Sequence, residues 1–173
     1  MLELNKNYFE LFGLSLSFQV DLSLLKSNYR QILLKVHPDK FAHTTEQERR
    51  IALQYTALIN EAYKTLVSPL HRAIYFLALH GVSINLENNT AMPAEFLLEQ
   101  INFREAIETA EENEQKLLII ASEISELKQT IIKNLTVLFE KITEENLSKA
   151  KQFVLKLTFF EKLLADIKER VQH

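Results

Sequence analysis

The sequence contains no cysteine, and only two glycines and three prolines among its 173 residues. The lack of cysteine excludes disulfides, zinc sites of the cysteine type and cysteine ligation of an iron–sulfur cluster. Few glycines and prolines favour long helices joined by few turns. No apolar run reaches the roughly 18 to 20 residues that span a bilayer, and residues 1–5 match neither a signal peptide nor a transit peptide. We therefore expect a cytoplasmic protein that does not associate with membranes.

The charges divide the chain into two different halves. The net charge of −3 argues against a dedicated nucleic-acid binder. Residues 1–80 carry nine Lys/Arg and seven Asp/Glu, a net charge of +2, whereas residues 81–173 carry eleven and sixteen, a net charge of −5. This asymmetry suggests two domains with different partners. The five histidines show no tight ligand spacing, so we expect no metal site and no cofactor.

The first half opens with helix signals. Asn7 can cap a short helix, and Asp21 can cap a second helix that runs to His37. Apolar residues recur every three or four positions along this second helix: Leu22, Leu25, Tyr29, Ile32, Leu33 and Val36. Lys26 and Arg30 fall together beside that stripe and lead towards His37. They form either a basic track that ends at the turn or an ordinary solvated flank of the helix.

His37, Pro38 and Asp39 form the turn that ends this helix. Pro38 stops the helix, because its ring restricts the preceding residue and it has no N–H to donate. His37 and Asp39 are therefore expected to face solvent or a partner. Taken alone, such a turn is equally consistent with a simple helix stop carrying two solvated polar residues.

Two further helices follow the turn. Thr44 and Thr45 with Gln47 and Glu48 offer a capping-box start to a helix of about 20 residues. Pro69 suits the first turn of a short helix that Gly81 ends. Residues 1–80 thus predict a helical hairpin with a small helix on either side and the turn at its tip.

Several segments of this half resemble a J-domain in order and spacing. They are Tyr8-Phe9-Glu10-Leu11-Phe12-Gly13-Leu14, Tyr29-Arg30, His37-Pro38-Asp39-Lys40, Ile59-Asn60-Glu61-Ala62-Tyr63, Leu66, Pro69, Arg72 and Tyr75. The resemblance implies docking on a DnaK-class ATP-driven chaperone and stimulation of its ATP hydrolysis. It gives His37, Pro38 and Asp39 the triggering role and Lys26 and Arg30 the docking role, so the chain itself is not expected to be an enzyme.

The second half begins after a stretch rich in turn formers, residues 81–92, which we interpret as a linker. A helix is then expected over about 93–112. At roughly 100° per residue, one face of it gathers the expected core residues Phe96, Phe103, Ile107 and Ala110. Leu97, Leu98 and Ile101 lie on the far side. Since a helix packed on one side should be polar opposite its core, these aliphatics indicate a partner-binding patch. Burial on both faces and a scatter of surface leucines are the alternatives.

Two long helices, at about 114–142 and 144–171, complete an antiparallel three-helix bundle over residues 93–173. Each is about 40 Å long at 1.5 Å per residue. Leu155, Phe159 and Leu163 form a second stripe on the last helix. They can pack against the first helix of the bundle or remain partly exposed beside its outer patch.

Three segments resemble the C-terminal domain of HscB proteins, the J-proteins dedicated to iron–sulfur cluster assembly. They are Ala73-Ile74-Tyr75-Phe76-Leu77-Ala78-Leu79-His80-Gly81, Phe96-Leu97-Leu98-Glu99-Gln100-Ile101 with Arg104-Glu105, and Leu157-Thr158-Phe159-Phe160-Glu161-Lys162-Leu163. The resemblance covers nearly the whole chain. It implies that the bundle binds an IscU-type scaffold and presents it to an HscA-type chaperone. The family's scaffold-contacting positions map onto Leu97, Leu98, Ile101, Asn102, Glu105 and Phe159.

Four positions depart from the family patterns. Gln31 and Leu34 stand where other J-domains are often basic, which reduces the expected electrostatic docking surface. Leu98 stands where methionine is common, a change that conserves volume. Asn102 stands where glutamate is common, which removes a charge at that position. These departures point to a specialised chaperone partner and a modified scaffold contact.

The sequence therefore predicts an all-α co-chaperone with a J-domain at residues 1–80, a linker at 81–92 and a scaffold-binding domain at 93–173. A second hypothesis is a general J-protein whose bundle recognises other clients or self-associates. A third hypothesis, a metal-dependent or acid–base enzyme using His37 and Asp39, lacks a clustered ligand set and a glycine-rich phosphate loop.

Overall fold

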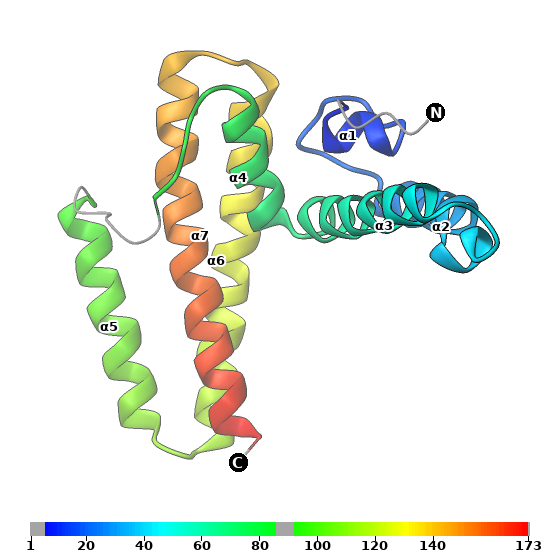
Figure 1. Ribbon diagram of the computed structural model, residues 1–173. Helices are drawn as coiled ribbons and strands as arrows, with labels where there is room; N and C mark the ends of the chain where they lie inside the picture. Colours follow the sequence, from blue (N-terminus) through cyan, green and yellow to red (C-terminus); the bar gives the residue numbers. More distant parts are fainter. Residues whose placement is uncertain (1–5, 86–91, 173) are drawn as a thin grey trace. The chain divides into compact units, whose positions relative to one another are not determined.

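The computed structural model describes residues 6–85 and 92–172, where the secondary structure is helical and contains no strand (Figure 1). This confirms the predicted all-α class. The described helices are α1 (Tyr8–Leu11), α2 (Leu22–Val36), the 3-10 helix η1 (Pro38–Phe41), α3 (Glu46–Val67), α4 (Pro69–Leu79), α5 (Ala94–Ala110), α6 (Glu114–Glu140) and α7 (Glu144–Val171). None of them combines the length and the apolar composition needed to cross a membrane.

The chain divides into two compact units, residues 1–75 and 76–173, so the division falls within α4. The domain limits predicted from the sequence place all of α4 in the first domain, and they remain a prediction. Phe76 and Leu77 are buried, and the ring centroid of Phe76 lies 4.6 Å from that of Phe139 on α6. The last turns of α4 therefore contribute to the core of the second unit.

In the first unit, α2 and α3 pack against each other as the predicted hairpin (Figure 1). Asp21 caps α2, because its side chain accepts hydrogen bonds from the first backbone N–H groups of the helix. The Tyr29 ring stacks on Tyr63 with 4.0 Å between centroids, and the Tyr29 hydroxyl donates to the Asn60 Oδ1 atom at 2.9 Å. These cross-hairpin contacts fix the register of the two helices and hold the connecting turn at one end of the pair.

Arg72 is a buried cation of the first unit, with only 6% of its surface exposed. Its Nη1 atom donates to the Leu66 carbonyl oxygen at 2.7 Å, in the last turn of α3, and its guanidinium lies 5.1 Å from the centroid of the Phe18 ring. The Nε atom is buried and has no hydrogen-bond partner among the described residues. Burial lowers the pKa of Arg72. The side chain thus supplies a hydrogen-bond donor to a carbonyl group in the last turn of α3, but its own charge is desolvated.

We expect Arg72→Ala to lower the free energy of unfolding by about 2–4 kcal/mol. The substitution opens a cavity beside Phe18 and leaves the Leu66 carbonyl without its donor, and relief of the desolvated guanidinium only partly offsets these losses. Arg72→Met retains most of the volume and should cost less. Denaturant unfolding followed by circular dichroism measures both variants. Equal stability of Arg72→Ala and the wild type would show that the guanidinium does not hold α3 in place.

In the second unit, α5, α6 and α7 run antiparallel in succession, α6 packs along α7, and α5 contacts both (Figure 1). The Phe96 ring meets the rings of Phe159 and Phe160 edge-on, at centroid distances of 5.7 and 6.3 Å. Phe103 adds a third edge contact to Phe160 at 5.8 Å. The predicted core face of α5, Phe96, Phe103, Ile107 and Ala110, is buried as expected.

The connection after α5 contains a strained backbone. Glu111 has φ 51° and ψ −121°, and it is the only non-glycine residue with positive φ in the described part of the chain. This conformation matches the first central position of a type II′ turn, which glycine occupies at little cost. A side chain with a Cβ atom is disfavoured there.

We expect Glu111→Gly to raise the free energy of unfolding by about 1 kcal/mol, since glycine relieves the strain. Glu111→Gln removes the same charge but keeps the Cβ atom, so it serves as the matched control. Thermal and denaturant unfolding of the three proteins measure the effect. If the glutamine variant gains as much stability as the glycine variant, charge repulsion rather than backbone strain is responsible.

Candidate functional site

The turn at the end of α2 presents an acidic and an imidazole side chain to solvent. Helix α2 ends at Val36, and His37 leaves the helical conformation with ψ 132° before Pro38 starts η1. The Asp39 side chain is 91% exposed and that of His37 is 54% exposed. Their closest approach joins the His37 Nδ1 atom to the Asp39 Oδ2 atom at 3.5 Å, and the Asp39 backbone N–H reaches the same Nδ1 atom at 3.4 Å. Such long contacts leave the Asp39 carboxylate free to accept hydrogen bonds from a partner.

The basic residues of α2 lie at different distances from this turn. Arg30 lines an open hollow together with His37 and Asp39, and Lys26 is exposed one helical turn earlier. The structure thus brings Arg30 and the turn together and places Lys26 beyond the hollow. The remaining walls of the hollow are Leu33, Leu34 and Lys40. Leu34 is largely exposed, so an aliphatic surface adjoins the charged groups.

The outer face of α5 carries the second candidate surface. Leu97, Leu98 and Ile101 are 48%, 58% and 52% exposed, although the opposite face of the same helix is buried. This confirms the predicted outward orientation and rules out burial on both faces. Asn102 and Glu105 are also exposed on this helix. Half-exposed aliphatics at adjacent positions are typical of a surface that a partner covers.

Phe159 differs from the other residues assigned to this surface by the sequence. It is only 8% exposed, and it packs edge-on against Phe96. The Arg104 guanidinium lies over the ring, 5.7 Å from its centroid. The stripe of Leu155, Phe159 and Leu163, for which the sequence left two possibilities, is buried throughout. Arg104 and the small exposed part of Phe159 therefore line the same hollow beside α5.

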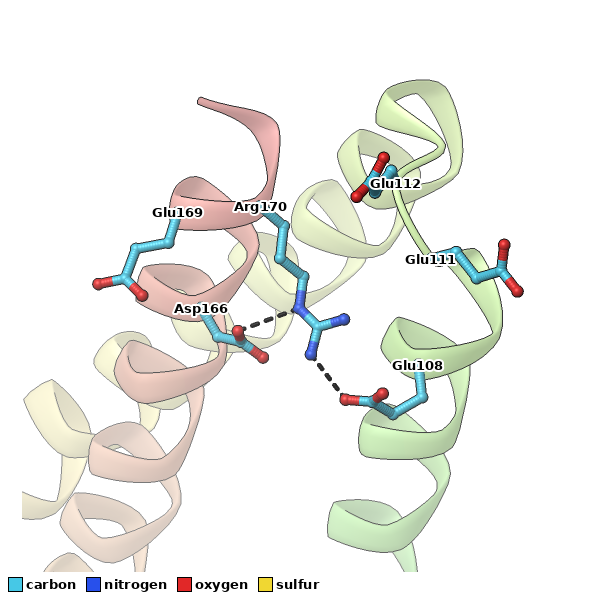
Figure 2. A pocket seen from close by; sticks show the side chains of 6 residues that line it. All are labelled: Glu108, Glu111, Glu112, Asp166, Glu169 and Arg170. Carbon is cyan, nitrogen blue, oxygen red and sulfur yellow. Dashed lines mark hydrogen bonds and ion pairs between the residues drawn. The ribbon is translucent and has the colours of Figure 1, made fainter. Parts of the chain in front are cut away.

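Acidic residues gather where α5 and α7 end, but an arginine occupies their centre. Figure 2 shows Glu108, Glu111, Glu112, Asp166 and Glu169 around Arg170. The Arg170 Nε atom donates to the Asp166 Oδ1 atom at 3.1 Å, and its Nη2 atom donates to the Glu108 Oε1 atom at 2.6 Å. The hydrogen bond to Asp166 is the largest cause of a raised pKa for Arg170, and the hydrogen bond to Glu108 raises it further. We interpret the cluster as an ion-pair link between α5 and α7.

The described residues contain no group of three or more His, Asp or Glu side chains placed to hold a metal ion. The exposed groups at the two candidate surfaces are instead suited to reversible contact with another macromolecule. The turn offers a carboxylate, an imidazole and a guanidinium, and α5 offers aliphatic side chains. Exposed charges steer association and fix its register, whereas apolar side chains supply most of the affinity.

Comparison with known families assigns a domain to each unit. The DnaJ domain matches residues 7–75, and the HSCB C-terminal oligomerisation domain matches residues 92–168. Together these matches cover most of the chain.

Curated proteins and solved structures resemble the chain over nearly its full length. The co-chaperone protein HscB homolog of Shewanella loihica is 37% identical over 93% of this chain and 95% of its own, and that of Cupriavidus taiwanensis is 38% identical over 98% and 96%. The structure of chaperone HscB from Vibrio cholerae has a TM-score of 0.84 and 34% identity, over 95% of this chain and 96% of its own. The crystal structure of human co-chaperone protein HscB has a TM-score of 0.92 and 30% identity, over 99% and 85%.

Proposed function

The chain belongs to the HscB family of J-domain co-chaperones, and from this premise we propose a function for each of its two candidate surfaces. The first unit stimulates ATP hydrolysis by an HscA/DnaK-class chaperone through His37, Pro38 and Asp39. The second unit binds an IscU-type iron–sulfur scaffold and delivers it to that chaperone. The chain works as an activator of a partner's ATPase, in the cytoplasm, and carries no catalytic residues of its own.

The chaperone-facing half of the proposal is supported by the exposure of the turn. An aspartate that is 91% exposed contributes little to the stability of its own protein, so its carboxylate is free to engage a partner. Lys26 and Arg30 lead to this turn along one side of α2, and neither has a carboxylate partner among the described residues. A contact made by a few exposed charges is weak and transient, as a cycling chaperone requires.

The scaffold-facing half is carried by one observation, the exposure of Leu97, Leu98 and Ile101 opposite a buried face of the same helix. Burial of three half-exposed aliphatics supplies a small hydrophobic centre for an interface. Asn102 and Glu105 lie along the same helix and offer polar groups around that centre. Phe159 is proposed to support this surface from below, since its ring is covered by Arg104.

Binding of a purified IscU-type scaffold to the purified chain tests the proposal. We expect a one-to-one complex in a titration or pulldown, and no complex with an unrelated unfolded client. Capture of unfolded clients without capture of the scaffold would instead identify a general J-protein.

Self-association through the bundle is a second candidate function. The description of the matching C-terminal family as an oligomerisation domain favours it, and the exposed aliphatics of α5 are suited to it as well. Sedimentation of the chain alone and with the scaffold separates the two. The proposed function predicts a complex of chain and scaffold that forms at concentrations where the chain alone sediments as a monomer.

A further inference from the structure

Helix α5 lies between two hollows whose walls carry opposite charges. The hollow on the α7 side is bordered on α5 by Leu97, Gln100 and Arg104, which share one side of that helix at spacings of three and four. The hollow on the α6 side is bordered on α5 by Glu95, Leu98, Glu99 and Asn102. The aliphatic patch of α5 is therefore shared between them, with Leu97 on one flank and Leu98 on the other.

The flank towards α7 is basic. Arg104 and Lys162 both line this hollow, and both are exposed. None of the lining residues, all of which belong to the described part of the chain, is Asp or Glu. No hydrogen bond or ion pair of Arg104 to another described residue accompanies its contact with the Phe159 ring. Two cations thus face a hollow of mixed polar and apolar lining, without an acidic partner among the described residues.

The contact between Arg104 and Phe159 prepares the guanidinium for a carboxylate. The guanidinium lies over the ring, at 5.7 Å from its centroid, and the ring itself is held by Phe96 and Phe160. Contact with an aromatic ring restricts a guanidinium while leaving N–H groups to donate. An arginine that is already ordered loses less conformational entropy when a carboxylate binds in bidentate fashion.

The flank towards α6 is acidic. Glu95 and Glu99 from α5 and Glu123 from α6 line this hollow, and none of its lining residues, which the structure describes in full, is Lys or Arg. Glu99 also approaches Lys156 of α7 at 3.9 Å, whereas Glu95 and Glu123 have no ion pair with another described residue. The charged residues that line these two hollows are therefore of opposite sign on the two sides of α5.

We propose that this polarity orients the scaffold on α5. The scaffold places a carboxylate in the hollow towards α7, where the Arg104 N–H groups donate to it with Lys162 nearby, and places a basic group along the flank towards α6. Leu97, Leu98 and Ile101 supply apolar contact between the two. This inference rests on the proposed function, and it adds Arg104 as the residue that fixes the orientation of the bound scaffold. Charge complementarity of this kind determines register and discriminates against wrong partners, and the charge-assisted hydrogen bonds of Arg104 also add affinity.

The dissociation constant for a purified IscU-type scaffold tests the inference, measured with the full-length chain at low and at high salt. Arg104→Met keeps the aliphatic cover of Phe159 and removes the charge, and Arg104→Glu reverses the charge. We expect about tenfold weaker binding for Arg104→Met and a larger loss for Arg104→Glu at low salt. Both variants should also show a smaller dependence of affinity on salt than the wild type. Lys133→Glu makes the same charge change on α6 at a position that lines neither hollow, and it should remain within about twofold of the wild type.

Two controls separate this inference from the proposed function. The double variant Leu97→Ala with Ile101→Ala should lose scaffold binding whether or not the polarity matters. If the double variant loses binding and both Arg104 variants bind within about twofold of the wild type, Arg104 does not orient the scaffold. The proposed function would still stand in that case. Equal losses for Arg104→Glu and Lys133→Glu would also overturn the inference, since they would report net charge alone. Failure of the wild type to bind the scaffold would overturn the proposed function itself.

Discussion

Replacement of Asp39 by asparagine is expected to abolish stimulation of the chaperone's ATPase while leaving the fold and scaffold binding unchanged. The Asp39 side chain is 91% exposed, and among the described residues its carboxylate approaches only the His37 imidazole, at 3.5 Å. Asparagine has nearly the same size, so the protein itself should lose almost no stability. The partner, however, loses a charged acceptor, and a hydrogen bond to a charged group contributes about 1.5–3 kcal/mol. This corresponds to binding of the chaperone that is weaker by roughly tenfold to more than a hundredfold.

Steady-state ATP hydrolysis by an HscA-type chaperone, titrated with the variant, measures this effect. Glu61→Gln is the matched control, because Glu61 is also exposed and lies on α3 about four turns from the end nearest the turn. It should stimulate hydrolysis as well as the wild type does. Undiminished stimulation by Asp39→Asn would show that the turn does not trigger the chaperone, and the assignment of His37, Pro38 and Asp39 would fail with it.

The double substitution Leu97→Ala with Ile101→Ala is expected to weaken scaffold binding by about 2–3 kcal/mol, roughly 30- to 150-fold in the dissociation constant. The two side chains are 48% and 52% exposed, so they can bury further apolar surface when a partner covers them. They lie one turn apart on the outer side of α5, so a partner can cover both at once. Their removal should change the free energy of unfolding much less, because they pack only partly against the bundle.

Calorimetric titration of the scaffold into each protein measures this loss. Val137→Ala with Ile142→Ala is the matched control, because it truncates two exposed aliphatics elsewhere in the same unit. That variant should bind with the wild-type affinity. If both double variants bind equally well, the aliphatics of α5 are ordinary surface residues. If both lose affinity equally, the effect reports general loss of apolar surface and not a site on α5.

Features that depend on neighbours in the sequence could be predicted well. The sequence predicts a capping box from Thr44 and Thr45 with Gln47 and Glu48, and Thr45 and Glu48 form it, with the Thr45 hydroxyl accepting from the Glu48 backbone N–H. Asp21 caps α2 as predicted. The two faces of α5 could be separated by angle alone, because a regular helix advances by about 100° at each residue. Predictions of this kind succeed where geometry is set within one or two helical turns.

Features that depend on contacts between helices could not be predicted from periodicity. Phe159 belongs to a stripe whose burial depends on how closely α5 approaches α7, and the ring proves to be covered by Arg104. The ion pair of Arg170 with Glu108 joins positions 62 residues apart, and the buried contact of Arg72 with Phe18 crosses an entire hairpin. Arg104 follows Leu97 by seven residues, and this spacing was the one sequence signal that it borders the same flank as Leu97.

The division of the chain within α4 was also beyond prediction from local signals. Gly81 correctly marks the end of the helix, with φ +79° after Leu79. The residues that end a helix do not show which core each of its turns packs against. Tyr75 stacks on Tyr8 at 4.3 Å in the first unit, whereas Phe76 packs against Phe139 in the second. Adjacent residues of one helix thus belong to different cores, because they point to different sides of it.

The rate of ATP hydrolysis by an HscA-type chaperone, measured with the chain, with the scaffold and with both, tests the central claim most directly. The claim is that one chain engages the chaperone through Asp39 and carries the scaffold on α5. We predict that chain and scaffold together stimulate hydrolysis well beyond the sum of their separate effects, and that Leu97→Ala with Ile101→Ala retains only the stimulation due to the chain alone. Stimulation that is the same with and without scaffold, for the wild type and for this variant, would contradict the account.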